Sequence, residues 1–372
     1  MLKSLKIENF RCFPSFEMQQ LGRLNLIVGT NNSGKTSILE AIHLLTAQSN
    51  LEVLQVLKDT MTVRGEYIND DNGGHELEVR HLFRDHIIHE NSKLSIKSHP
   101  NPLHEITLYI THIGTDKKIS YADLINPKFA GETDFLPDLR GFELNVERFG
   151  LPDQNLKLPL SSDDGLDFEF IGWTRRDLRS TIAKTQFVGF ASLTIEKTIE
   201  LFDQVVLTSE EDLVIEALQI LEPSVKRIAA KGSERSRQNS SRGNLVVRLA
   251  NNEIIPIGSM GDGIWRILGL ILAVVNAKNG VLLVDEIDTG LHFTVMSDMW
   301  KMLWETAKRL NVQIFATTHS NDCWKSLADI ANAENPSEDG ITIHRVEKGK
   351  PHSIVFTEDE IAIAAEEGIE VR

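Results

Sequence analysis

The chain has 372 residues, a formal net charge of −15, and ordinary fractions of hydrophobic (41%) and charged (25%) residues, so it can bury a substantial core. The acidic balance argues against a surface that binds nucleic acid as a whole, and no run approaches 18 consecutive apolar residues, so we expect no membrane span. Two cysteines, Cys12 and Cys323, are too few for a disulfide framework, and with no signal-peptide pattern they predict a cytoplasmic protein.

The first informative segment is a glycine-rich loop between an apolar strand and an apolar helix. Leu24–Val28 reads as a buried parallel strand, Gly29–Thr36 has the sequence GTNNSGKT, and Ser37–Leu45 has apolar residues at helical spacing. This is the context that a P-loop requires. Backbone N–H groups and a helix N-terminus attract phosphate, so we expect ATP to bind here. The expected contacts come from Gly29, Asn31, Asn32, Ser33, Gly34, Lys35, Thr36 and Ser37.

Two side chains of this loop have distinct expected roles. Lys35 should reach the β- and γ-phosphates and act in catalysis, and Thr36 should hold Mg²⁺. A glycine turn with a chance lysine is the competing interpretation, and the agreement of strand, loop and helix disfavours it.

The middle of the chain predicts a β-rich lobe followed by an insertion. Glu76–Phe83 and Glu105–Ile113 have strand patterns, and Asp70–Gly74 predicts a turn. Residues 121–244 predict an inserted lobe rich in helix, with helices at Arg175–Lys184 and Glu210–Leu221. No heptad pattern is sustained there, so we expect no long coiled coil.

A basic stretch lies late in this insertion, within a sequence rich in Ser, Gly and Asn. It contains Lys226, Arg227, Lys231, Arg235, Arg237 and Arg242. It could contact a phosphate backbone of DNA, and a solvated loop between a helix and a strand is the interpretation that we favour. Binding of DNA is therefore left open.

The last third of the chain returns to buried strands, beginning with Asn244–Leu249. Val281–Val284 is an apolar strand that ends at Asp285 and Glu286, and Gln313–Ala316 is another that precedes His319. At such strand ends Asp285 should coordinate Mg²⁺, Glu286 should polarise the attacking water, and His319 could hydrogen-bond the γ-phosphate. Loop capping by the acids and a structural role for the histidine are the alternatives.

The chain closes with a hairpin and a helix. Ile341–Val346 and Ser353–Phe356 predict the two strands, and Thr357 with Glu360 predicts a capping box for the last helix. We therefore expect one head that is split in the sequence, residues 1–120 and 245–372, around the inserted lobe at 121–244.

These motifs together resemble the ABC-type ATPase heads of the SMC/RecF/OLD group. The opening segment Leu5–Phe13 is similar to the first strand and arginine turn of that group, and Val284–His292 is similar to its Walker B and D-loop segments. The resemblance implies an α/β P-loop NTPase fold with a mixed parallel core sheet, an antiparallel β lobe and an inserted α-rich lobe. It implies that Arg11 approaches the nucleotide phosphates, whereas a solvated surface arginine is the alternative.

The resemblance also implies a site shared between two molecules. Ser259-Met260-Gly261-Asp262 stands where the group carries its signature, although Gly258, Met260 and Asp262 depart from the usual LSGG(E/Q) pattern. In the group, Ser259 and Gly261 would contact the γ-phosphate bound by the other subunit, and the apolar helix Ile264–Val275 would follow. We therefore expect a homodimer that closes on ATP; a glycine-rich loop capping a core helix is the alternative.

Other positions are less informative. His292 serves either dimer communication or local packing, and Gln186 is the only candidate for a Q-loop residue. Only 53 residues follow His319, which leaves no room for the TOPRIM nuclease domain of OLD-type proteins.

The sequence thus predicts an ATPase that cleaves ATP to ADP and phosphate and acts as a conformational switch. The resemblance implies a role in DNA repair or anti-phage defence, with a nuclease or toxin as a separate effector and no membrane partner. An ATP-gated scaffold with little hydrolysis is the alternative. The large insertion and the altered signature disfavour a transporter subunit, and a small-molecule kinase would have no use for a signature.

Overall fold

The computed structural model describes residues 1–69, 75–98, 104–113, 139–148, 153–161, 163–167, 185–230, 245–332 and 339–371. The expected turn Asp70–Gly74, the expected helix Arg175–Lys184 and four of the basic residues, Lys231, Arg235, Arg237 and Arg242, lie outside these ranges.

The centre of the molecule is a six-stranded sheet whose strands come from distant parts of the chain. Its order is β11-β15-β16-β3-β17-β18, and all neighbours are parallel except β17 and β18. The strands are β11 (Thr185–Val188), β15 (Val281–Val284), β16 (Gln313–Thr317), β3 (Leu24–Val28), β17 (Ile341–Arg345) and β18 (Ile354–Phe356).

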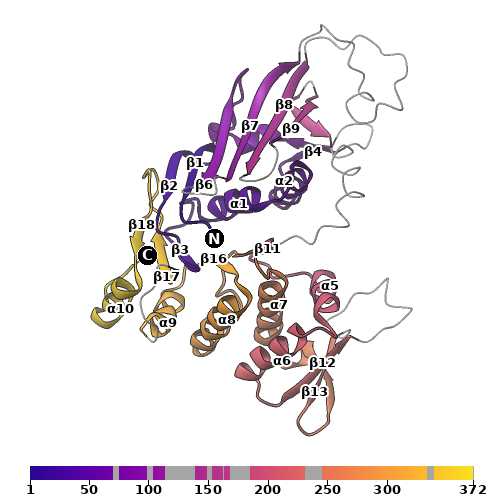
Figure 1. Cartoon of the computed structure of the whole chain (residues 1–372), viewed down its shortest axis with the longest axis vertical. Coiled ribbons are helices and arrows are strands. Elements are labelled where there is room, and N and C mark those ends of the chain that lie inside the picture. Colours follow the sequence, from indigo (N-terminus) through magenta and orange to yellow (C-terminus); the bar gives the residue numbers. More distant parts are fainter. Residues whose placement is uncertain are drawn as a thin grey trace.

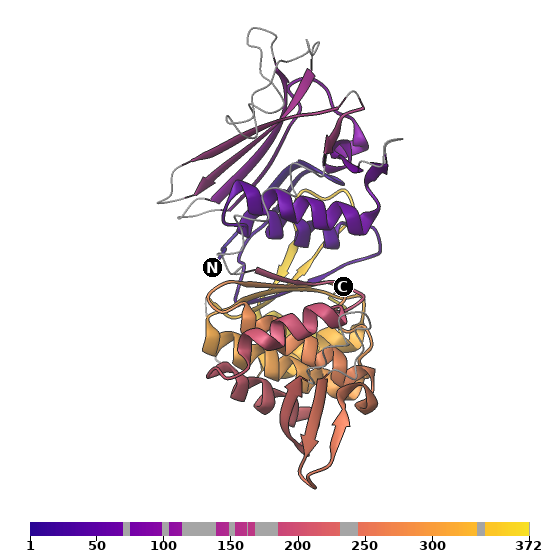
Figure 2. The ribbon, with the colours of Figure 1, turned by 90° about the vertical axis from the view of Figure 1, so that its right-hand side faces the viewer.

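Both faces of this core sheet are covered, which explains why its strands read as continuous apolar runs. Leu24, Leu26 and Val28 of β3 pack into one hydrophobic cluster, and Ile27 packs into the other. The first cluster holds the helices α5 (Ile195–Val205), α6 (Glu210–Leu221), α7 (Asp262–Asn276), α8 (Met296–Leu310) and α9 (Asn321–Ala331). In Figure 2 these helices lie below the sheet, and α1 and α2 lie above it.

The second cluster lies between the core sheet and an antiparallel sheet, with α1 (Lys35–Thr46) and α2 (Asn50–Arg64) between them (Figure 1). The antiparallel sheet has the order β2-β1-β6-β7-β8-β9. Its strands are β1 (Leu5–Phe10), β2 (Phe13–Met18), β6 (Lys93–Ser98), β7 (His104–Ile113), β8 (Leu139–Arg148) and β9 (Gln154–Pro159). The molecule is therefore layered: antiparallel sheet, two helices, core sheet and a helical layer.

Two small sheets and short helical turns complete the described elements. One sheet joins β10 (Gly165–Asp167), β5 (His75–Glu78) and β4 (Tyr67–Asn69); the other joins β12 (Val225–Ala230), β13 (Leu245–Leu249) and β14 (Ile254–Pro256). The 3₁₀ turns are η1 (Val79–Leu82), η2 (Arg84–His86), η6 (Ile257–Met260) and η7 (Phe293–Val295). The last helix, α10 (Glu358–Glu367), begins at a capping box in which the Glu360 carboxylate accepts the Thr357 N–H at 2.9 Å.

One predicted strand is wrong in its second half. The segment expected at Glu76–Phe83 is a strand only as far as Glu78, and the chain then turns through η1. The turn lets Phe83 bridge to Phe10 and lets the Leu82 carbonyl accept the Arg11 N–H at 2.9 Å. The apolar side chains of this segment, Val79, Leu82 and Phe83, are buried by that turn and not by strand alternation.

The residues expected to form an inserted lobe contribute to several layers. β8 and β9 extend the antiparallel sheet beyond β7, and β11 forms an edge of the core sheet. The helix predicted at Glu210–Leu221 is confirmed as α6, and it packs against α7. The boundaries at 120 and 245 thus stay a prediction. Described strands within 121–244 pair with a strand that comes earlier in the sequence (β8 with β7) and with one that comes later (β11 with β15).

None of the helices in the described part of the chain combines the length and apolar character that a bilayer span requires.

Candidate active site

The glycine-rich loop leaves β3 and enters α1 as predicted. Gly29 (φ 146°) and Gly34 (φ 100°) have backbone angles that residues with a side chain rarely adopt. A β-carbon on Gly34 would also lie 2.3 Å from the ring of Phe13, and one on Gly29 would lie 2.3 Å from the carbonyl oxygen of Val346. Both glycines are therefore required by conformation and by close packing, and the loop geometry depends on them.

Two polar side chains of the loop, Lys35 and Ser33, are buried. Lys35 is buried, and its Nζ donates to the carbonyl oxygens of Gly29 (2.9 Å) and Thr30 (3.0 Å). Burial lowers the pKa of the Lys35 ammonium, while Asp285 and Glu286 oppose that shift. The buried Ser33 hydroxyl has no hydrogen-bond partner among the described residues. A lysine bound only to its own loop and an unpartnered hydroxyl fit a loop that is shaped for phosphate oxygens.

The P-loop and the acidic strand end are joined directly. The Thr36 hydroxyl donates to the Asp285 carboxylate, at 3.0 Å to Oδ2 and 3.3 Å to Oδ1. These are the two residues predicted to hold Mg²⁺, and hard oxygen donors of this kind suit that ion. Among the described residues no group of three or more His, Cys, Asp or Glu side chains could hold a metal, and Mg²⁺ at nucleotide sites uses one or two protein ligands plus phosphate oxygens and water.

Thr317, at the end of β16, is a site residue that the sequence reasoning missed. Its hydroxyl donates to Asp285 Oδ1 at 2.6 Å and accepts the backbone N–H of Glu286 at 2.8 Å. One side chain therefore sets the positions of both acids. Glu286 needs this support because its φ of 48° is strained for a residue with a side chain. The sequence signal is limited to Thr317 following the apolar run Gln313–Ala316, because its place beside the Asp285 strand depends on the sheet order.

His319 lies near the same charges. Burial lowers the pKa of its imidazole, and the nearby Lys35 lowers it further, whereas Glu286, Asp288 and Asp285 oppose the shift. The histidine is thus kept neutral next to the lysine, and a neutral ring can donate one hydrogen bond. The structure therefore brings together Lys35, Thr36, Asp285, Glu286 and His319.

Arg266 is a second residue that the sequence reasoning missed. It lies on α7 and is buried, and its guanidinium donates to the carbonyl oxygen of Glu286 (3.0 Å) and more distantly to that of Asp285 (3.4 Å). It also donates to the Gly189 carbonyl (3.1 Å) and the Ser192 hydroxyl (2.9 Å), just after β11. The helix that follows the signature is thereby tied to the backbone of the acidic strand end.

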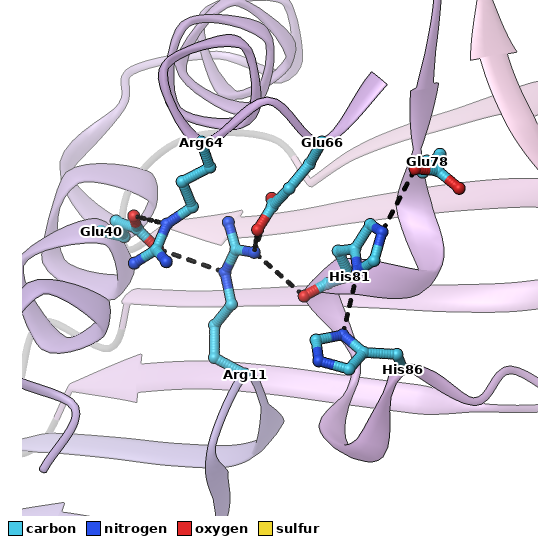
Figure 3. Close-up of polar contacts among 7 residues, drawn as sticks. All are labelled: Arg11, Glu40, Arg64, Glu66, Glu78, His81 and His86. Carbon is cyan, nitrogen blue, oxygen red and sulfur yellow. Dashed lines mark hydrogen bonds and ion pairs between the residues drawn. The ribbon is translucent and has the colours of Figure 1, made fainter. Parts of the chain in front are cut away.

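Arg11 does not reach the P-loop side chains. Its guanidinium forms ion pairs with Glu40 of α1 (Nε to Oε2, 3.2 Å) and with Glu66 (Nη1 to Oε1, 2.5 Å), and Glu40 also pairs with Arg64 (2.5 Å; Figure 3). Arg11 Nη1 further donates to the carbonyl oxygen of His81 at 3.0 Å. The alternative of a solvated surface arginine is wrong, because Arg11 is only 7% exposed. Its approach to phosphate stays a prediction.

The signature segment stands at the surface, next to the D-loop. Ser259 and Gly261 are exposed, and no hydrogen bond among the described residues joins either to the P-loop. A β-carbon on Gly263 would lie 4.0 Å from the carbonyl oxygen of Gly290. Beyond Gly290, Phe293 is 58% exposed and His292 is also exposed, with its Nδ1 2.9 Å from the Thr294 hydroxyl.

Gln186, the candidate Q-loop residue, lies within β11 and pairs in register with Leu282 of β15. It is therefore part of a strand, and the turn Gly189–Ser192 that Arg266 contacts comes after it. A loop role for Gln186 has no support in this geometry.

Comparison with known proteins shows the family to which the chain belongs. The model of the AAA ATPase domain family matches residues 1–158 and 170–323. The chain belongs to the AAA ATPase domain family. A protein named ATP/GTP phosphatase from Helicobacter pylori is 22% identical over 337 residues, which cover 87% of this chain and 86% of that protein.

A further curated protein and a solved structure are also similar to this chain. The DNA replication and repair protein RecF of Chlorobium phaeovibrioides is 55% identical over 42 residues, which are only 11% of each chain. The SMC head domain from Thermotoga maritima aligns over 96% of this chain and 98% of its own, at 13% identity and a TM-score of 0.43. Kinship with RecF-type ATPases, predicted from the motifs, is thereby confirmed for a short segment, and the ATPase family for most of the chain.

Proposed function

We propose that this protein hydrolyses ATP to ADP and phosphate, with Mg²⁺ as cofactor. The observation that carries the proposal is the hydrogen-bonded chain from Thr36 through Asp285 to Thr317 and the Glu286 N–H, which fixes P-loop and acids together. The ATP/GTP phosphatase relative, alike over most of its length, supports the reaction class.

Each residue has one proposed task. Lys35 exchanges its bonds to the loop carbonyls for bonds to the β- and γ-phosphates, and Thr36 with Asp285 would hold Mg²⁺, which neutralises phosphate charge when bound. Glu286 accepts a hydrogen bond from the attacking water and orients it. His319 donates to the γ-phosphate. The backbone N–H groups of Asn31 to Ser37 would surround the phosphates. Positioning and charge stabilisation, without a covalent intermediate, would carry the reaction.

We further propose that the site closes between two copies of the chain. Ser259 and Gly261 are exposed, and the adjoining Gly263 lies close to Gly290 of the D-loop. Signature and D-loop thus form one surface that could cover the γ-phosphate of a partner molecule in a two-fold dimer. Hydrolysis would separate the copies, and that change of state would be the output.

We also propose a cellular role as a molecular switch. The short stretch of identity with RecF supports a switch in DNA repair or, by the same kinship, in anti-phage defence, with a separate effector. Lys226 and Arg227 of the basic stretch lie on β12 and are exposed, which keeps contact with DNA open. Cys12 and Cys323 are both free thiols, in keeping with a reducing compartment.

The test is the molar mass of Glu286→Gln protein by light scattering, with and without Mg-ATP, beside phosphate release. We expect a dimer only with ATP, and a fall in hydrolysis of about 100-fold or more. Glu367→Gln, an exposed acid on α10, is the matched control and should behave as wild type. Wild-type hydrolysis by Glu286→Gln would show that the base is misassigned.

The same experiment separates the alternative function. If wild-type protein dimerises on ATP yet releases phosphate no faster than the Lys35→Ala variant, the chain is an ATP-gated scaffold. The departures at Gly258, Met260 and Asp262 from the usual signature favour keeping that alternative.

A further inference from the structure

A cavity of about 200 Å³ lies at the edge of the core sheet opposite the P-loop. Its lining includes Thr185, Val281 and Gln313, the first residues of β11, β15 and β16. The P-loop follows the other, carboxyl end of the parallel strands. The antiparallel sheet contributes Arg148 and His104 to the lining, so the cavity sits at the junction of the two large sheets.

Arg148 is a buried cation with no ion pair to any described residue. It ends β8 and is 8% exposed, and among the described residues neither its Nε nor its Nη2 has a hydrogen-bond partner. Burial lowers the pKa of its guanidinium, and the charge of Glu52 opposes this from a distance. The Glu52 Oε2 accepts the Gln48 N–H at 2.5 Å. A buried charge without a close partner is strongly unfavourable.

A second polar group without a described partner, the imidazole of His104, lies beside Arg148. His104 is paired in register with Arg148 across β7 and β8, and its buried Nδ1 has no hydrogen-bond partner among the described residues. Burial lowers the pKa of His104, and Arg148 and the N-terminal amino group lower it further, so the ring is neutral and has one N–H to donate. Among the described residues that line the cavity there is no Asp or Glu.

The threonine hydroxyls at the cavity wall are already engaged with protein groups, since Thr185 Oγ1 donates to Thr46 Oγ1. The hydroxyls of Thr46 and Thr185 lie 2.9 Å apart at the cavity wall. Thr46 ends α1, where the helix dipole would repel an anion. However, the last carbonyl groups are already engaged: Thr46 Oγ1 donates to Ile42 O at 2.9 Å, and Gln48 Nε2 donates to Thr46 O at 2.9 Å.

We propose that this junction cavity binds a phosphate group, with Arg148 and His104 as its principal ligands. The Nε and Nη2 edge of arginine presents two parallel N–H groups to two oxygens of one anion. The His104 ring can add an N–H from β7, the strand that pairs with β8. The source is either free phosphate or the terminal phosphate of a nucleic acid, and both supply the same group.

The site is distinct from the ATP site. α1 has 12 residues and so spans about 18 Å, with the P-loop at its start and the cavity at its end. Its two principal ligands come from the antiparallel sheet, and its walls also include residues of α1 and the core sheet.

Calorimetric titration with inorganic phosphate at constant ionic strength tests the proposal. The full chain carries Lys35→Ala, so that phosphate binding at the P-loop does not contribute. We expect saturable binding, weakened at least tenfold by Arg148→Met. Arg140→Met is the control: Arg140 lies on the same strand, is 47% exposed and pairs with Asp164, so affinity should not change. No binding, or equal affinity after Arg148→Met, overturns the proposal.

A second variant and a second ligand complete the test. His104→Gln should also weaken binding, while Arg148→Met should melt no lower than its parent without phosphate, since an uncompensated buried charge is removed. A 5′-phosphorylated dinucleotide that binds more tightly than inorganic phosphate, with its 5′-hydroxyl form inactive, assigns the site to nucleic-acid ends. The reverse order assigns it to free phosphate, and failure of both ligands refutes the site.

Discussion

At the residue scale, the acids of the site are positioned by neighbours more than by their own strand. Asp285 accepts hydrogen bonds from Thr36 on one side and Thr317 on the other. Glu286 has a strained backbone whose N–H donates to the Thr317 hydroxyl and whose carbonyl oxygen accepts from the Arg266 guanidinium. The carboxylates are thus oriented before nucleotide arrives, which lowers the reorganisation that catalysis requires.

A buried histidine gives a prediction at this scale. His344 is fully buried, between the hydroxyls of Thr342 (3.0 Å) and Ser353 (3.2 Å). The Thr342 hydroxyl donates to Asn25, so it can only accept from His344 Nε2, and Nδ1 is left as the acceptor from Ser353. Burial lowers the pKa of His344 from 6.5 to about 3.

The sign of the pH dependence follows. Between pH 6.5 and 3 the unfolded chain binds a proton at His344 that the folded chain does not, so the free energy of unfolding falls as pH falls. From pH 6.5 to 4.5 this should remove about 2 kcal/mol. Urea unfolding of His344→Gln should show a loss smaller by that amount, and above pH 7 the two slopes should coincide. Parallel curves throughout would exclude His344 as the titrating group.

At this scale, the role of a residue could be predicted from the sequence only where it depends on residues nearby in the chain. Lys35 and Thr36 could be placed because they close a glycine-rich loop between an apolar strand and a helix, and Asp285 and Glu286 because they follow an apolar strand. Thr317 and Arg266 could not be given roles, because their partners lie on neighbouring elements whose contacts depend on sheet order. The pairing of Arg11 with Glu40 and Glu66 likewise depends on how α1 and the end of α2 pack.

At the scale of elements, α7 is the part that connects signature and acids. It begins at Gly261 of the signature, and one turn later Arg266 bonds the backbone of Asp285 and Glu286. The same guanidinium holds the turn after β11. A shift of α7 would therefore move the acidic strand end, and in the dimer that we propose this would couple the dimer surface to hydrolysis.

Arg266→Lys tests that connection. Lysine keeps the charge but cannot reach four oxygen acceptors with a planar fork, so we expect phosphate release to fall about tenfold or more while ATP affinity stays within a few fold. Fluorescent-nucleotide binding and phosphate release measure the two quantities. Arg309→Lys, an exposed arginine on α8, is the control. Equal losses in both quantities would point to general damage instead.

Strands were predicted best where burial is complete. β3 and β15 match the expected bounds, and β16 is longer by one residue, because a parallel strand covered on both faces is apolar throughout. The strand expected at Glu76–Phe83 failed because apolar residues in a turn imitate strand alternation. α2 was not recognised, since polar residues interrupt its apolar positions.

At the scale of the whole molecule, the layered head exposes Ser259 and Gly261 of the signature segment. The mixed fold class is confirmed by the two large sheets of opposite type. The division at residues 120 and 245 could not be judged from sequence patterns, because strand pairing crosses it. β7 and β8 are paired although they lie on opposite sides of residue 120 in the sequence, and β11 pairs with the much later strand β15.

The site that we propose to be shared between two copies makes a prediction for mixtures. Ser259→Arg should block the surface offered to a partner but keep a working P-loop, and Lys35→Ala should do the opposite. Neither variant alone should hydrolyse ATP, whereas their mixture should recover at most one composite site per dimer, measured as phosphate release against mixing ratio. A mixture as inactive as its components would argue against a site built from two copies.

The central place of β3 in the core sheet has a consequence for synthesis on the ribosome. Leu24 pairs with Ile314 on one side and Ile341 on the other, so the strand that leads into the P-loop waits about 290 residues for its first neighbour. At about 5–20 residues per second this is roughly 15 to 60 seconds. During that time an apolar strand with two open edges must be shielded by other means, and the nascent chain cannot bind nucleotide until it is nearly finished.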